Sequence, residues 1–211
     1  MHNINDLYQF SQYIPPVDLS LHQYLLLASD PILVHSGDIG QAEKIIPQID
    51  EILKGISLKY IFVSHFESDE CGGINLFVKK FPEIKVICSE ITSRQLLGFG
   101  IKGNILPQKD NDIIVGDNYT LKFITYPSEI HLQDGLIMYE EARKVLFSSD
   151  LMFRFGNTHG KLIENKWKAE IETIDIGRIP NIDKINELKK KLFEIKPNFI
   201  AVGHGPCIII Q

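Results

Sequence analysis

Residues 64–73 read S-H-F-E-S-D-E-C-G-G and place three metal-ligand side chains, His65, Glu67 and Asp69, at alternate positions. The apolar run Y-I-F-V directly before this stretch predicts a buried strand. Apolar residues at helical spacing over 74–81 predict a helix directly after it. The donors therefore stand where a strand ends and a helix begins, which is where open α/β folds build their sites. A solvated acidic loop that caps the helix is the alternative interpretation.

Length and composition indicate one globular domain. The chain has 211 residues, 44% hydrophobic and 23% charged, which is enough to bury a sizeable core. A net charge of −5 argues against nucleic acid or an anionic membrane as a partner. The sequence has neither a membrane-spanning apolar run nor a signal-peptide start. Its three cysteines form no disulfide pattern, so we expect a reducing, cytoplasmic compartment.

Strands and helices alternate along the chain. Residues 7–35 predict a meander of antiparallel strands, and an apolar stripe over 42–53 predicts a helix that ends at Gly55. Pro47 either kinks that helix or marks its first turn. Residues 151–180 predict a long loop, functional or packed as a lid. Further strands are predicted at 85–88, 112–115, 121–126, 136–139, 144–147 and 199–202, and further helices at 89–99 and 182–193.

Candidate ligands recur at other strand and loop ends. His131 lies in a polar loop, and Asp150 and His204 each follow a predicted strand. A lone histidine is more often a surface or capping residue than a ligand. A histidine or carboxylate at each of four such positions, however, indicates one site at the edge of an α/β sandwich of two or four layers.

These positions resemble the metallo-β-lactamase superfamily, and within it the diiron domain of flavodiiron proteins. The flavodiiron motif H-x-E-x-D-H-x-G corresponds to residues 65–72, with a glutamate where the superfamily has its second histidine. The family's H-W-P-D, L-F-S-x-D and S-H-G motifs correspond to HLQD at 131–134, LFSSD at 146–150 and GHG at 203–205. The resemblance covers nearly the whole chain and implies an α/β fold, the metallo-β-lactamase-like four-layer αββα sandwich.

The resemblance also implies the ligand set. The first iron would take His65, Glu67 and His131, the second would take Asp69 and His204, and Asp150 would bridge them. A carboxylate in place of an imidazole hardens the site and favours iron over zinc, although two Zn²⁺ ions remain the alternative. Few protein ligands per metal leave open positions, as a reactive site needs. No catalytic residue is predicted beyond these ligands.

Three residues depart from the family pattern or lie beside it. Glu70 stands where the family usually has histidine, and we expect it to face outward or to act through water. His35 stands where the superfamily often has aspartate, so we interpret it as structural or as a support for a ligand. His159 could overhang the site, although a solvated loop histidine is the simpler interpretation.

Flavodiiron proteins carry a flavodoxin-like domain after the diiron domain, whereas this sequence has no glycine-rich phosphate loop. We therefore expect one diiron domain over 1–211 that binds no FMN, similar to the stand-alone oxygen-binding diiron proteins. It would bind dioxygen, as an oxygen sensor with a signalling partner, or reduce dioxygen or nitric oxide with electrons from an external flavoprotein or rubredoxin-like donor. The alternatives are a dinuclear zinc hydrolase of an ester, thioester or phosphodiester, and a degenerate fold that only binds a partner.

The resemblance further implies a homodimer, because two flavodiiron chains pack head to tail. The aromatic residues Phe153, Phe155 and Trp167 are candidates for that dimer surface or for a lid over the site. Internal packing of these side chains is the alternative, since exposed aromatic clusters are uncommon on monomers.

Overall fold

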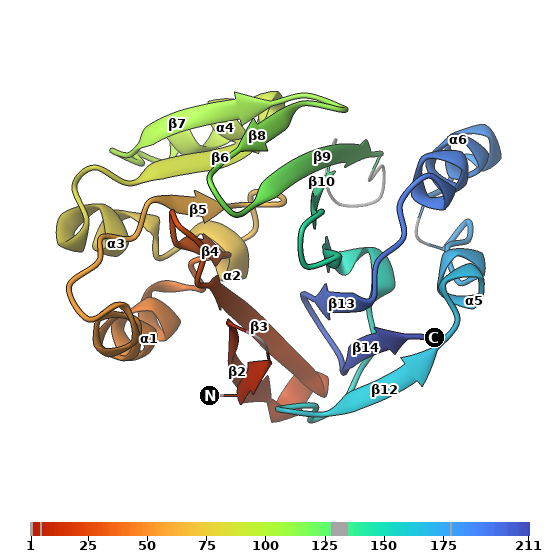
Figure 1. Ribbon diagram of the computed structural model, residues 1–211, viewed down its shortest axis with the longest axis horizontal. Helices are drawn as coiled ribbons and strands as arrows, with labels where there is room; N and C mark the ends of the chain where they lie inside the picture. The colour runs from red at the N-terminus through yellow and green to blue at the C-terminus, as the bar shows by residue number, and fades with distance from the viewer. Residues whose placement is uncertain (1, 5, 128–134, 178) are drawn as a thin grey trace.

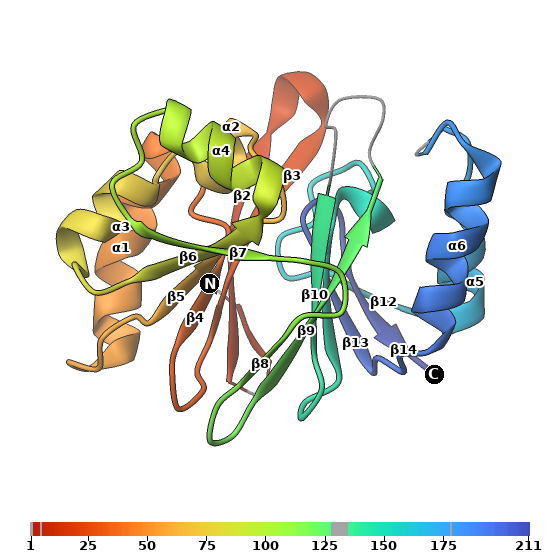
Figure 2. The same ribbon diagram turned by 90° about the horizontal axis from the view of Figure 1, so that it is seen from above.

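The computed structural model describes residues 2–4, 6–127, 135–177 and 179–211. Two seven-stranded sheets face each other, and helices cover the outer side of each sheet (Figures 1 and 2). The arrangement is the four-layer αββα sandwich that the resemblance implied. No helix in the described ranges is long and apolar enough to cross a bilayer.

The first sheet changes from antiparallel to parallel pairing along its width, in the order β1-β2-β3-β4-β5-β6-β7. The pairs β1–β2, β2–β3 and β3–β4 are antiparallel, which confirms the meander predicted for 7–35. The remaining pairs are parallel, so β4, β5 and β6 end at the same edge. The strands are β1 (His2–Ile4), β2 (Leu7–Ile14), β3 (Leu19–Leu26), β4 (Ile32–Val34), β5 (Tyr60–Phe62), β6 (Lys85–Ser89) and β7 (Asn104–Gln108).

The second sheet has the order β12-β14-β13-β11-β10-β9-β8. Its central strands β11 and β13 are parallel, so these two also end together. The strands are β8 (Ile113–Val115), β9 (Thr120–Tyr126), β10 (Gly135–Glu140), β11 (Val145–Ser149), β12 (Leu162–Asn165), β13 (Phe199–Val202) and β14 (Cys207–Ile210).

Three apolar cores, one between each pair of adjacent layers, hold the sandwich together. The middle core joins the sheets, with the rings of Phe62 and Phe123 at a centroid distance of 6.0 Å. Burial of apolar side chains on both sides of a sheet explains the nearly continuous apolar strands. The outer helices are α1 (Ile39–Leu53), α3 (Ile74–Lys80) and α4 (Glu90–Gly98) on the first sheet, and α5 (Trp167–Glu172) and α6 (Ile182–Phe193) on the second.

Two local expectations are settled by the structure. Pro47 lies inside α1, which begins after Asp38 in a reciprocal capping box with Gln41, so the proposal that Pro47 opens the helix is wrong. The stretch 151–180 is not one long loop, because it contains β12 and α5. These elements have four and six residues, too short for a clear periodic pattern.

Candidate metal site

The predicted ligands come together where strands of both sheets end. His65 follows β5, and Asp69 lies in the short helix α2 (Ser68–Cys71), at the upper edge of the first sheet in Figure 2. From the second sheet, Asp150 opens the single-turn helix η2 (Asp150–Met152) after β11, and His204 follows β13. His131 lies outside the described residues. We call the six side chains of His65, Glu67, Asp69, Glu70, Asp150 and His204 the donor cluster.

The two histidines face carboxylates from different elements. Nε2 of His65 lies 3.4 Å from Glu70 Oε2 and 3.7 Å from Glu67 Oε2. Its distance to Asp150 Oδ2 is 3.8 Å. Nε2 of His204 lies 3.2 Å from Asp150 Oδ1 and 3.8 Å from Asp69 Oδ2. Asp150 therefore directs a different oxygen at each histidine, which is the placement that a bridging carboxylate requires.

Glu70 belongs to the cluster, and the expectation that it faces outward is wrong. Its side chain is only 2% exposed, and its Oε2 lies 3.4 Å from His65 Nε2. The donor atoms form two groups, and within each group all of them lie within 4.8 Å of one another. The first group is His65, Glu67 and Glu70, and the second is Asp69, Glu70 and His204. Glu70 is thus within reach of both groups. The motif pattern alone gave no signal for this orientation.

The donor cluster fits a cation. Among the described residues, His65 Nε2 and Glu70 Oε2 are buried without a hydrogen-bond partner, and the buried Asp150 Oδ1 faces His204 Nε2 at 3.2 Å. Buried polar atoms are nearly always paired, so such a concentration of unpaired ones needs an explanation. Imidazole and carboxylate donors are those that iron, zinc and manganese accept. A cation between these atoms would satisfy all of them.

Burial and mutual repulsion control the charge of the carboxylates. Burial, followed by the negative charges of Asp69 and Asp150, raises the pKa of Glu70 well above its ordinary value. Burial would also raise the pKa of Asp150, but the hydrogen bond and positive charge of His204 lower it well below its usual range. Burial would lower the pKa of His204, yet Asp150 and Asp69 raise it. Without a cation, Asp150 and His204 therefore form an ion pair.

Each histidine of the donor cluster is oriented through its other ring nitrogen. His65 Nδ1 lies 2.9 Å from Ser64 Oγ, which also contacts Ser149 Oγ at 2.7 Å. His204 Nδ1 lies 3.1 Å from the carbonyl oxygen of Ser20. Metal-bound histidines usually have such partners, which fix the ring and its tautomer. The sequence did not identify these serines, since serine next to a motif is common in loops.

The two other histidines near the site have different environments. His35 is 2% exposed and stacks on Phe62 with its ring nitrogen Nε2 2.9 Å from Ser64 Oγ, in agreement with a structural or supporting role. His159 is exposed on the loop after η2 and belongs to neither donor group of the described residues.

The three candidate aromatic residues divide between lid and core. The Phe153 ring lies edge-on to the His204 ring, at 5.3 Å between centroids, and so covers one side of this donor. Phe155 packs against Phe153 and is 66% exposed. The Trp167 indole N–H donates to the carbonyl oxygens of Leu192 and Ile195, each at 3.1 Å. Trp167 therefore packs internally, while Phe153 and Phe155 form a partial lid.

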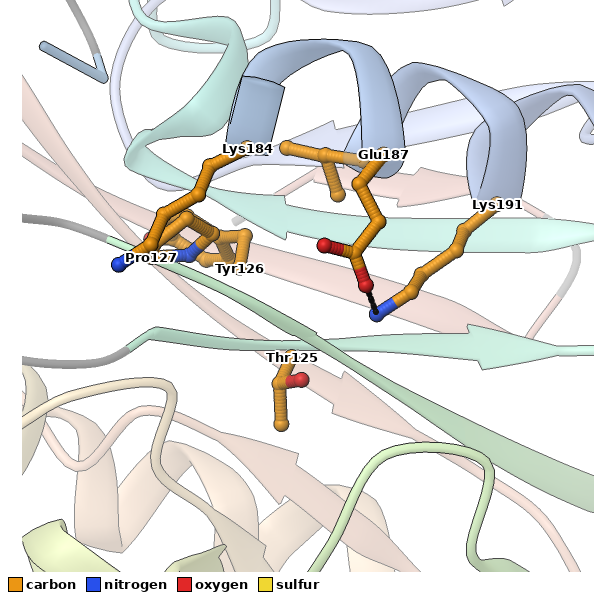
Figure 3. A pocket seen from close by; sticks show the side chains of 7 residues that line it. Thr125, Tyr126, Pro127, Lys184, Glu187 and Lys191 are labelled. Carbon is orange, nitrogen blue, oxygen red and sulfur yellow. Dashed lines mark ion pairs between the residues drawn. The ribbon is translucent and has the colours of Figure 1, made fainter. Parts of the chain in front are cut away.

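A groove between β9 and α6 lies on the outer side of the second sheet (Figure 3). Its wall carries Lys191, which pairs with Asp110 at 3.0 Å and Glu187 at 3.7 Å. None of the donor cluster lines this groove. We assign no chemistry to it.

Comparisons with known proteins agree with this fold. The flavo-diiron protein FprA2 of Clostridium acetobutylicum is 24% identical over 207 residues, covering 90% of this chain and 49% of that protein. The anaerobic nitric oxide reductase flavorubredoxin of Aliivibrio salmonicida is 25% identical over 134 residues, 62% of this chain and 27% of that protein. The chain thus spans about half or less of these relatives.

Solved structures show the same fold. The flavodiiron protein of Giardia intestinalis superposes with a TM-score of 0.78 at 17% identity, covering 98% of this chain and 54% of that protein. A family model described as "ODP family beta lactamase" matches residues 19–205, nearly the whole of the chain. This match includes every residue of the donor cluster, and the chain belongs to the ODP family of the beta-lactamase fold.

Proposed function

We propose that the protein is a non-haem diiron protein that binds a diatomic gas, dioxygen or nitric oxide. The observation that carries this proposal is the number of carboxylates around two histidines: Glu67, Glu70, Asp69 and Asp150. Hard, anionic oxygen donors favour iron over the zinc of histidine-rich sites. The names of the similar flavo-diiron and nitric oxide reductase proteins support the same assignment.

Each side chain has a role in this proposal. His65 and Glu67 would hold the first iron together with His131, and Asp69 and His204 would hold the second. Asp150 would be shared by the two, and Glu70 lies within reach of both donor groups. When bound, the iron pair would supply the redox chemistry and open coordination positions for the gas.

The protein's own groups control access and proton content at the site. Phe153 covers the side of His204 and excludes water there. Glu70 has a raised pKa, so it carries a proton in the metal-free site and releases that proton when a cation arrives. Binding of metal is therefore expected to release at least one proton.

Repeated reduction of the gas would need an electron donor that recharges the iron pair. We propose an external flavoprotein or rubredoxin-like donor if the protein is a reductase, and a signalling partner if it is a sensor. A homodimer and a cytoplasmic location belong to the same proposal. The exposed Phe155 is the candidate aromatic residue for a dimer contact.

Anaerobic purification, metal quantification and an optical spectrum before and after adding air test this proposal. We expect close to two irons per chain and a visible absorption band that appears with oxygen and disappears with reductant. Stoichiometric zinc, no response to oxygen, and hydrolysis of an activated ester that Asp69→Ala abolishes would establish the hydrolase instead.

A further inference from the structure

A buried chain of hydrogen bonds leads from the backbone of β3 to His65. His35 Nε2 lies 2.9 Å from Ser64 Oγ, and Ser64 Oγ lies 2.9 Å from His65 Nδ1. His35 also makes a side-chain hydrogen bond to the backbone of His22, in β3. Since Nε2 of His35 faces Ser64, the bond to His22 uses Nδ1. All three side chains are fully or almost fully buried, so water does not compete for these bonds.

The donor and the acceptor in each of these hydrogen bonds follow from hydrogen-bond chemistry. A backbone carbonyl only accepts, so His35 Nδ1 carries the hydrogen that bonds to His22. Burial lowers the pKa of His35 to about 3, so the ring is neutral and its Nε2 is an acceptor. The Ser64 hydroxyl must then donate to His35.

Ser64 has one hydrogen, and giving it to His35 leaves its oxygen to accept from the other neighbours. His65 Nδ1–H and the Ser149 hydroxyl, at 2.9 Å and 2.7 Å, supply those two bonds. A hydrogen on Nδ1 leaves the lone pair of neutral His65 on Nε2. That lone pair faces Glu67, Glu70 and Asp150, where a cation held by these carboxylates would accept it.

We propose that His35 is a positioning residue that, through Ser64, fixes the tautomer and ring orientation of His65 as a metal ligand. His35 would thereby set the affinity of the first metal without touching it. The inference rests on the proposed metal site, but not on the identity of the metal or of the gas. Loss of a group that orients a ligand typically lowers metal affinity 10- to 100-fold.

Two variants of similar shape separate this role from simple packing. His35→Gln keeps an acceptor within reach of Ser64, and His35→Leu removes it. Both place a flexible side chain at the same left-handed backbone position, where φ is 62°, so both carry similar backbone strain. Ser64→Ala removes the hydroxyl that links His35 to His65. Ser148→Ala is the matched control, because Ser148 is equally buried and its hydroxyl has no partner among the described residues.

The experiment titrates Zn²⁺ into chelator-stripped protein against a competing chromophoric chelator, and follows the ¹⁵N signals of His65 and His204 to assign each affinity to its metal. We expect His35→Leu and Ser64→Ala each to weaken the first zinc about 10- to 100-fold, with little change at the second. His35→Gln and Ser148→Ala should stay close to the wild type. The double variant His35→Leu/Ser64→Ala should lose no more than either single variant, because both interrupt one chain.

A second readout is the His65 Nδ1–H proton in the zinc-loaded protein. It should resonate far downfield and exchange slowly in the wild type, and exchange faster in His35→Leu. Equal losses at both metals, equal losses in His35→Leu and His35→Gln, or additive losses in the double variant would overturn the positioning role. Zinc serves as a probe, so a protein that passes this test but takes up no iron would contradict only the proposed function.

Discussion

Replacing Glu70 by glutamine should stabilise the metal-free protein and at the same time weaken its binding of metal. The Glu70 carboxyl is almost fully buried among Glu67, Asp69 and Asp150, and its Oε2 has no hydrogen-bond partner in the described residues. Glutamine has nearly the same shape but no ionisable proton. The substitution therefore removes the free-energy cost of keeping this buried carboxyl protonated above its ordinary pKa.

The stability that Glu70→Gln gains over the wild type, in the absence of metal, should increase as the pH rises. The pKa of Glu70 is raised above its ordinary value in the folded state. Above the ordinary pKa the unfolded chain has lost this proton while the folded, metal-free protein keeps it, so stability falls as pH rises. One proton gives a slope of about 1.4 kcal/mol per pH unit, up to the folded pKa. The variant should therefore gain stability relative to the wild type as the pH rises from the ordinary carboxyl pKa towards the raised pKa of Glu70.

Chemical denaturation in the presence of chelator, at several pH values, measures this difference. Glu140→Gln is the matched control, because Glu140 is also fully buried but accepts hydrogen bonds from the backbone N–H groups of Ala142 and Arg143. The control should lose about 1–3 kcal/mol instead of gaining stability.

In the presence of metal, the same substitution of Glu70 should be unfavourable, because it weakens metal binding. With metal present, Glu70→Gln should lose affinity by about tenfold or more, since an amide oxygen is a weaker ligand than a carboxylate. A wild type and Glu70→Gln that unfold with the same pH dependence, or that bind metal equally, would refute the reasoning about this side chain.

Three further predictions concern the rest of the site. Asp150→Asn should lose both metals together by metal analysis, since Asp150 directs one oxygen at each histidine; selective loss of one metal would contradict bridging. Gly205→Ala should destabilise the protein by roughly 1–3 kcal/mol in thermal denaturation and weaken the second metal, because φ is 109° and a Cβ would lie 3.1 Å from the Arg154 backbone. Trp167→Phe should cost about 1–2 kcal/mol by the same assay, through two lost hydrogen bonds, and leave metal content unchanged.

The sequence predicted most of the fold because its signals are local. The run before His65 is buried on both faces, so it is apolar throughout and reads as the strand β5. The stripe of α1 reads as a helix because one face packs on the first sheet. The strands β7 and β14 were not predicted. The side chains of β7 are mostly exposed or partly exposed, and β14 begins just after the turn that carries His204. Pairing across the sheet decides such strands, and one segment cannot reveal its partners.

The site was predicted less completely than the fold. Motif spacing identified five donors that the structure brings together, but it gave the wrong orientation for Glu70. That orientation depends on how α2 packs beside the end of β4, where the Ser36 N–H donates to the Glu70 carbonyl oxygen at 2.8 Å. The role of Ser64 and His35 likewise depends on a contact between residues 29 positions apart. Such contacts are set by tertiary packing, which is absent from local sequence patterns.

The donor cluster also explains how metal and fold depend on each other. Backbone hydrogen bonds join the sheets beside the ligands, from Leu136 to Ser64 and from His22 to Gly203, at 2.9 Å and 3.1 Å. These bonds hold the buried Glu70 of the first sheet close to the partly exposed Asp150 of the second sheet, where a cation would offset the repulsion between carboxylates. A ligand that binds only the folded state stabilises it in proportion to its affinity. Packing of the two sheets therefore offsets the unfavourable proximity of Glu70 and Asp150. A cation that binds between them would remove this cost and so stabilise the folded protein.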